Sequence, residues 1–285
     1  MLKWPAIMTD EHLPKPWTRL RHVFVYDDPD TEGLNTDALA RFLADALPQA
    51  EVRVRNDYLT HQLRRYAEEG GEELIAQLTG QFTRAQVDNL VHPADRGLLP
   101  PEAPADLGLG EIYRGQALQA ILALMMLADE DSLDQLHIVL TSMVFGDWDE
   151  HTRDFRVRVG CLGQPSLIST TGLIEGPARP RDFEVLRTQM AVMGLDEDIA
   201  DLAEAFEPRA LGYGDRRITT CLQGYALMAI MYRAYGEGPC EDPTCRLHDA
   251  ATQEELIECQ CSEDAGLCER HSAMLVALAT GVDPV

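Results

Sequence analysis

Short β-rich runs alternate with amphipathic stretches in the first part of the chain. His22–Tyr26 (HVFVY) and Glu51–Arg55 (EVRVR) are typical of strands, and residues 36–47 between them place apolar side chains at helical spacing. A strand, a helix and a second strand at this spacing predict a βαβ unit with parallel strands. Residues 58–82 continue as a helix that breaks at the glycine pair 70–71.

The same patterns predict further elements toward the C-terminus. The expected strands span residues 136–144, 155–162 and 166–173, the last at an edge of the sheet, and the expected helices span 111–128, 180–193, 196–206 and Ile218–Tyr235. A short pattern, Gly-x-Ala-Leu-x-Ala-Ile, occurs at both Gly115 and Gly224, which indicates two core helices with small residues on one face rather than a tandem repeat. Together these elements favour an α/β fold with a central mixed sheet flanked by helices.

The chain has 285 residues, enough for one large domain with a small appendage. Residues 91–110 are rich in Pro, Gly and Asp, which predicts a loop-rich crossover inside the core. The expected parts are an N-terminal extension at 1–20, an α/β core at 21–239 and a cysteine-rich, zinc-binding segment at 240–285.

Acidic side chains outnumber basic ones by 48 to 24, a formal net charge of −24, and Lys3 and Lys15 are the only lysines. Such a surface repels phosphate backbones and anionic lipid head groups, so neither nucleic acid nor a membrane is an expected partner. A basic ligand, a cation or simple solubility fits the charge better. We expect a protein or peptide partner, whose identity the sequence does not disclose.

The sequence also predicts a soluble, cytoplasmic protein. Prolines and acidic residues interrupt residues 1–21, so no secretion signal is visible. The longest apolar stretch, 117–128, is too short to cross a bilayer and is typical of a buried helix. In a reducing compartment, clustered thiols more often hold metal than form disulfides.

Five of the seven cysteines lie between Cys240 and Cys268. The spacings Cys240-x4-Cys245 and Cys268-x2-His271 provide two ligand pairs, which is the arrangement that a tetrahedral structural zinc site requires. We therefore predict a structural zinc ion bound by Cys240, Cys245, Cys268 and His271. Zinc binding contributes about 10 to 16 kcal/mol in small zinc peptides, enough to order a loop-rich segment.

Other cysteines leave the ligand set open. Cys259 and Cys261 lie between the two pairs, and either one could replace a ligand or serve a second role. Disulfides, incidental buried thiols or another metal are the alternatives to zinc. Cys161 and Cys221 fall on a predicted strand and helix, where core packing is expected.

These spacings resemble the archaemetzincin family of zinc metallopeptidases. That family carries His-Glu-x-x-His-x-x-Gly-x-x-His-Cys on a helix, a second Cys after four residues and a late Cys-x-x-Cys. Its first two cysteines fall on Cys240 and Cys245, its turn glycine falls on Gly236, and its late pair falls on Cys268 and His271. The resemblance covers roughly the C-terminal half, and it implies a metzincin-like mixed sheet with a zinc-stapled C-terminal segment.

The departures from the family pattern bear on activity. The positions of the three zinc-binding histidines are occupied by Ala229, Arg233 and Pro239, and the position of the general-base glutamate is occupied by Ile230. None of these side chains can bind zinc or take a proton. An arginine about 4 Å from a divalent ion would cost roughly 8 kcal/mol at an effective dielectric of 20. The resemblance therefore implies no catalytic residues, no peptidase activity and a role in binding.

Two alternatives remain. The segment Asp147-Trp-Asp-Glu-His151 follows a predicted strand and could serve a metal-dependent hydrolase with a second metal; its donor residues are Asp147, Asp149, Glu150 and His151. A solvated turn is the simpler interpretation of this segment. Asp28 and its acidic neighbours follow the first strand and are expected to approach His151. The other alternative is a structural or assembly protein, which sequence does not reveal.

Overall fold

The structure, a computed structural model, describes residues 14–68, 72–87, 111–127, 129–149, 153–195, 202 and 205–281. The expected crossover at 91–110 lies outside the described residues, as do Glu150, His151 and most of the expected helix at 196–206. Within the described part, no helix is both long and apolar enough to cross a membrane.

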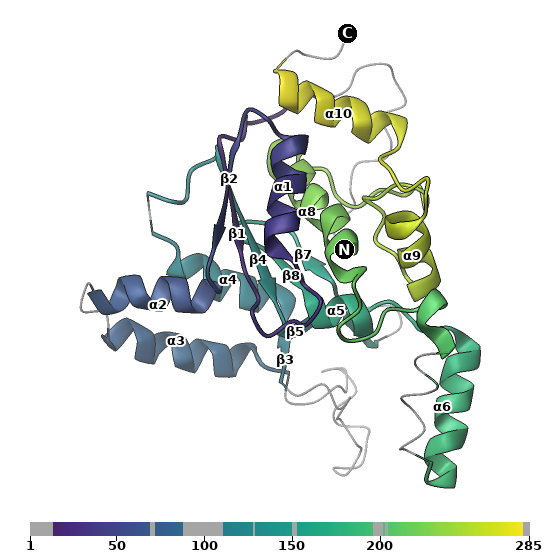
Figure 1. The fold of residues 1–285 in the computed structure, drawn as a ribbon. Coiled ribbons are helices and arrows are strands. Elements are labelled where there is room, and N and C mark those ends of the chain that lie inside the picture. Colours follow the sequence, from purple (N-terminus) through teal and green to yellow (C-terminus); the bar gives the residue numbers. More distant parts are fainter. Residues whose placement is uncertain are drawn as a thin grey trace.

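A five-stranded sheet lies at the centre of the molecule (Figure 1). In spatial order its strands are β2 (Glu51–Arg55), β1 (His22–Tyr26), β4 (Gln135–Thr141), β8 (Ser166–Ser169) and β7 (Gly160–Cys161). The first four are parallel, and β7 pairs antiparallel with β8. The parallel βαβ start and the mixed sheet that the sequence predicts are confirmed.

A second sheet has three strands, in the order β3 (Ile112–Arg114), β5 (Val144–Trp148) and β6 (Phe155–Val157). β3 is parallel to β5, and β6 is antiparallel to it. Residues 142 and 143 alone separate β4 from β5, so the chain passes directly from the large sheet into the small one.

Helices cover both faces of the large sheet. On one face lie α1 (Thr36–Ala46) and α8 (Ile218–Tyr235), and on the other lie α2 (Tyr58–Glu68) and α4 (Gly115–Met125), with α3 (Glu72–Ala85) packed against these two helices (Figure 1). Successive side chains of a strand point to opposite faces. Accordingly Val23 and Val25 join the core beneath α1 and α8, whereas Phe24 and Tyr26 join the core beneath α2 and α4.

α8 is buried on nearly all sides because α1, α9 and the large sheet enclose it. Such a helix has no polar face, which explains its apolar composition. It ends at Gly236, which adopts the left-handed conformation with φ of 71° and donates its N–H to the carbonyl of Tyr232. The turn glycine expected at this position is confirmed.

The remaining helices are α5 (Thr170–Glu175), α6 (Arg181–Met193), a 3-10 turn (Glu207–Arg209), α9 (Gln253–Cys261) and α10 (Glu269–Thr280). In Figure 1, α6 extends away from the sheets, α9 lies beside α8, and α10 lies at the top of the view. A capping box between Thr252 and Glu255 starts α9. Leu256 of α9 and Met274 of α10 pack into the core that contains α8, so the cysteine-rich segment is joined to the sheet by apolar contact.

Several predicted boundaries are wrong because short strands pair with partners that are distant in sequence. Ile112–Arg114 forms β3 against β5, so the helix expected at 111–128 begins at Gly115. The strand expected at 136–144 is divided between β4 and β5, and the strand expected at 155–162 is divided between β6 and β7.

The strand expected at 166–173 ends earlier than predicted and is not at an edge. It stops at Ser169, whose side chain accepts a hydrogen bond from the N–H of Gly172 at 2.7 Å and so starts α5. β8 lies between β4 and β7, and all of its residues are buried. The hydroxyl-rich end of this strand therefore lies inside the molecule, at the start of a helix.

Candidate functional site

The structure brings together the four residues predicted as metal ligands. One sulfur or nitrogen atom from each of Cys240, Cys245, Cys268 and His271 lies within 4.8 Å of the others. His271 Nδ1 is 3.1 Å from the sulfur of Cys268 and 3.7 Å from the sulfur of Cys245. Tetrahedral zinc with Zn–S and Zn–N bonds of about 2.3 and 2.0 Å separates such atoms by roughly 3.5 Å. The geometry of these side chains fits a metal of this kind.

Two backbone segments hold this metal-ligand cluster, formed by Cys240, Cys245, Cys268 and His271. In the first, the N–H of Cys240 donates to the carbonyl of Leu247 at 2.7 Å, which closes a loop directly after α8. In the second, Cys268 precedes the first turn of α10 and His271 lies within that turn. Arg246 N–H donates to the carbonyl of Gly266 at 2.8 Å and ties the two segments together.

Hydrogen bonds and burial act in opposite directions on these thiols. The sulfur of Cys245 accepts the N–H groups of Leu247 at 3.5 Å and Cys268 at 3.4 Å, contacts that favour a thiolate. Burial nevertheless raises the pKa of Cys245, and burial together with neighbouring thiols raises the pKa of Cys240 to about 12. Burial lowers the pKa of His271, which favours the neutral imidazole that binds metals. A metal would therefore have to displace thiol protons on binding.

The structure places Cys259 and Cys261 outside this cluster. The sulfur of Cys259 lies 3.5 Å from the carbonyl of Leu256, within α9. The sulfur of Cys261 lies 3.4 Å from that of Cys221 on α8. Cys221 is fully buried, as the sequence predicts, but its contact with Cys261 was not anticipated because nothing in the sequence spacing links the two helices.

The α8 positions where the resemblance places zinc ligands and a general base are filled in another way. Ala229 and Ile230 are 0% exposed and belong to the hydrophobic core. Arg233 donates from Nη2 to the carbonyl of Ser132 at 2.6 Å and from Nε to the carbonyl of Gln135 at 3.1 Å. These side chains fix α8 to the sheet and offer no donor atom for a metal.

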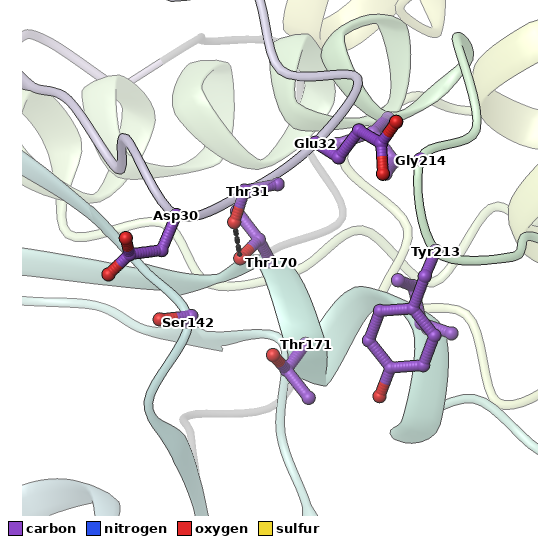
Figure 2. A pocket seen from close by; sticks show the side chains of 10 residues that line it. Asp30, Thr31, Glu32, Ser142, Thr170, Thr171, Tyr213 and Gly214 are labelled. Atoms are coloured by element: carbon purple, nitrogen blue, oxygen red, sulfur yellow. Dashed lines mark hydrogen bonds between the residues drawn. The ribbon is translucent and has the colours of Figure 1, made fainter.

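A polar pocket of about 230 Å³ opens at the carboxyl ends of β1, β4 and β8 (Figure 2). It is lined by Asp30, Thr31, Glu32, Ser142, Thr170, Thr171, Ile174, Tyr213, Gly214 and Ile218. Crevices outside the carboxyl ends of parallel strands are where α/β proteins commonly bind ligands. The pocket lies at the N-terminal end of α8, and Arg233 lies fifteen residues further along the helix, about 22 Å away at 1.5 Å per residue.

Hydroxyl groups and carboxylates give the pocket its chemistry. Asp28 is 5% exposed, and its carboxylate lies within hydrogen-bond distance of the hydroxyls of Thr31 and Thr170, whose oxygens are 2.6 Å apart (Figure 2). Burial raises the pKa of Asp28. Asp30 and Glu32 are exposed at the same loop. Because no basic side chain is among the described lining residues, the pocket favours a positively charged group.

The segment considered for a hydrolase is only partly described. Asp147 lies within the strand β5 and not in a turn. Burial in this strand raises the pKa of Asp147, and Gly115 and Cys161 are close neighbours. Asp149 forms an ion pair with Arg156 at 3.1 Å. Among the described residues, the only group of His, Cys, Asp and Glu side chains gathered closely enough for a metal is the metal-ligand cluster.

Comparisons with known proteins identify relatives of this chain. Residues 19–278 match the family described as "Probable metallopeptidase family (DUF6775)". Among solved structures, an archaemetzincin from Methanopyrus kandleri is similar over 92% of this chain and 96% of its own, with a TM-score of 0.44 and 12% sequence identity. No curated protein sequence matches this chain.

Proposed function

Because this chain belongs to a family described as probable metallopeptidases, we propose that it is a member that binds one structural zinc ion, lacks peptidase activity and acts by binding. The observation that carries this proposal is the core packing of Ala229 and Ile230 together with the backbone hydrogen bonds of Arg233. A peptidase of this kind needs three metal ligands and a base, and in the family pattern two of those ligands and the base lie on this helix. The helix instead contributes to packing.

Three thiols and one imidazole support zinc as the metal of the metal-ligand cluster. Soft sulfur ligands in a four-coordinate arrangement favour zinc over magnesium, calcium or manganese. A zinc ion held by four protein ligands has no open position, so it would stabilise the fold and would not activate water. The cluster would join the loop after α8 to the start of α10. The backbone of the two segments is paired at the isolated bridge between Cys245 and Gly266.

The polar pocket supports a binding role, and its ligand would be a basic segment of a protein or peptide. Asp30 and Glu32 supply negative charge, and Thr170, Thr171 and Ser142 supply hydrogen-bonding groups. The net charge of −24 would raise the local concentration of such a ligand. A volume of about 230 Å³ is enough for one or two side chains.

A calorimetric titration with two short peptides tests this binding role. The probes are acetyl-Gly-Arg-Gly-amide and acetyl-Gly-Glu-Gly-amide, which differ mainly in charge. The arginine peptide should bind more tightly, and the double variant Asp30→Asn/Glu32→Gln should weaken it about tenfold, since each exposed ion pair contributes up to about 1 kcal/mol.

Asp45→Asn is the control for loss of a surface charge elsewhere, because Asp45 is also exposed but lies near the end of α1, outside the pocket lining. Equal affinities for the two peptides, or equal losses in the double variant and in Asp45→Asn, would refute a basic ligand for this pocket. Metal-dependent cleavage of an unfolded protein substrate would refute the absence of peptidase activity.

A further inference from the structure

Two cysteines outside the metal-ligand cluster face each other across the contact between α8 and α9. The sulfur atoms of Cys221 and Cys261 are 3.4 Å apart, although the residues are separated by 40 positions in sequence. We propose that Cys221 and Cys261 form a redox-active dithiol that a peroxide converts into a disulfide. This inference does not depend on the proposed function, because neither cysteine belongs to the metal-ligand cluster or to the polar pocket.

Positive charges converge on this pair from two other segments. Arg246 Nη2 donates to the carbonyls of Thr220 at 2.9 Å and Gln260 at 3.2 Å, so its guanidinium lies beside both cysteines. Arg217, at the start of α8, also faces Cys261, and Asp215 opposes part of this charge. The pair therefore lies where a thiolate would be stabilised.

The two thiols differ in exposure and in acidity. Cys261 is partly exposed, whereas Cys221 is fully buried. The hydrogen bond from Cys221, followed by the charges of Arg217 and Arg246, lowers the pKa of Cys261. The pKa of Cys221 is raised by its contact with Cys261 and by burial. Cys261 is thus the nucleophile that a peroxide can reach, and Cys221 is the thiol that resolves the product.

The reaction balances with hydrogen peroxide as the oxidant. The thiolate of Cys261 attacks one peroxide oxygen, an S–O bond forms, the O–O bond breaks and hydroxide leaves, taking up a proton as water. The sulfur of Cys221 then attacks the sulfenic acid of Cys261, an S–S bond forms, the S–O bond breaks and hydroxide leaves with the Cys221 proton as a second water. Two thiols lose two electrons, and one peroxide becomes two waters.

Closing this bond requires the sulfur atoms to approach from 3.4 Å to about 2.05 Å. The disulfide would link α9 to α8, and the covalent ring so closed would contain Cys240 and Cys245 of the metal-ligand cluster. The buried Cys259, two residues from Cys261, contacts the carbonyl of Leu256 and is the natural control thiol.

Peptide mapping of the full-length protein as purified tests the proposal. After treatment with one equivalent of hydrogen peroxide and blocking of free thiols, mass spectrometry should find a Cys221–Cys261 cross-link that dithiothreitol removes. The cross-link should persist in Cys259→Ser and disappear in Cys221→Ser, where dimedone should trap Cys261 as its sulfenic acid. Cys221→Ala provides a second variant if the serine perturbs folding, which circular dichroism would show.

Three results would overturn the proposal. If Cys261 stays reduced under a peroxide treatment that oxidises a free cysteine peptide, it is not a reactive thiol. A Cys259–Cys261 cross-link in the wild type would show that Cys221 is not the resolving thiol. Oxidation of Cys240, Cys245 or Cys268 before Cys261, detected in the same peptide map without the cross-link, would show that the charges beside Cys261 confer no selectivity.

Discussion

Cys245 is the most enclosed of the four side chains in the metal-ligand cluster, with 0% of its surface exposed and two backbone N–H groups directed at its sulfur. We predict that Cys245→Ser loses zinc and lowers the free energy of unfolding by at least about 3 kcal/mol, because folding and metal binding are linked. Thermal unfolding with elemental analysis measures both effects. Cys161→Ser, which lies outside the cluster, should retain zinc, and an unchanged melting temperature in Cys245→Ser would contradict a structural metal.

His137 is a second residue whose burial has a measurable consequence. It is 0% exposed, contacts the hydroxyl of Tyr26 through Nδ1 at 2.9 Å and the carbonyl of Glu130 through Nε2 at 3.1 Å, and burial lowers its pKa from 6.5 to about 4. Below pH 6.5, His137 is therefore protonated in the unfolded chain, whereas in the folded protein it stays neutral until the pH approaches 4. Stability from this residue is present above the unfolded pKa and is lost as the pH falls toward 4.

Between pH 7 and pH 5, we expect this residue alone to lower the free energy of unfolding by about 2 kcal/mol. Urea unfolding of the wild type and His137→Gln at both pH values measures the difference, since both proteins keep the same metal ligands. The variant should show the shallower pH dependence. Identical pH dependence in the two proteins would mean that His137 does not remain neutral when folded.

At the scale of elements, the packing of α8 depends on Gly224. A methyl group at this position would overlap the side-chain amide of Gln260 and the carbonyl of Arg246, both held in place by α9 and the loop before it. Gly224→Ala should therefore destabilise the protein by about 1 to 3 kcal/mol despite the better helix propensity of alanine. Chemical unfolding measures the change.

Gly115, the equivalent residue of the repeated Gly-x-Ala-Leu pattern, is the matched control. Its added methyl group would meet the Phe145 ring at 3.3 Å, so a displacement of a few tenths of an ångström relieves the contact, much less than Gly224 requires. Gly115→Ala should cost less than about 1 kcal/mol. If both substitutions lower the free energy of unfolding equally, then α9 and the loop before it shift to accommodate the methyl group added to α8.

The sequence predicts elements best where the pattern is local. β1, α1, β2 and α8 match their predicted positions because periodicity within each segment determines them. The sequence does not predict β3, because Ile112–Arg114 is short and is stabilised by pairing with β5, about thirty residues away. The start of β5 is misplaced because the predicted strand at 136–144 joins it to β4. Helices α9 and α10 were not predicted because their sequences carry no strong amphipathic pattern.

The candidate sites, too, were predictable where the sequence pattern is local and not where distant segments meet. Spacing alone was enough to group Cys240, Cys245, Cys268 and His271, because metal ligands recur in pairs. The pocket was not predicted, since its residues come from the ends of β1 and β4, from α5 and from the segment leading into α8, although the hydroxyls at Thr170 and Thr171 were visible in the sequence. The contact between Cys221 and Cys261 depends on helix packing, which no local pattern encodes.

At the scale of the whole molecule, charge repulsion opposes folding. With a net charge of −24, we expect the free energy of unfolding to rise by on the order of 1 kcal/mol between about 0.01 and 0.5 M sodium chloride, as screening shortens from about 30 Å to a few Å. Surface ion pairs such as Arg209–Asp182 would weaken, but each contributes little. Thermal unfolding across this salt range measures the trend. A steady fall in the free energy of unfolding with rising salt would show that ion pairs outweigh net repulsion.

The zinc content of protein purified without added metal tests the central claim most directly. Elemental analysis should find one zinc ion per chain in the wild type and none in the double variant Cys240→Ser/Cys245→Ser, whose changes remove two of the four ligands. Two zinc ions in the wild type, one of them retained by the double variant, would contradict the claim, because they would reveal a second metal site and restore the case for a hydrolase.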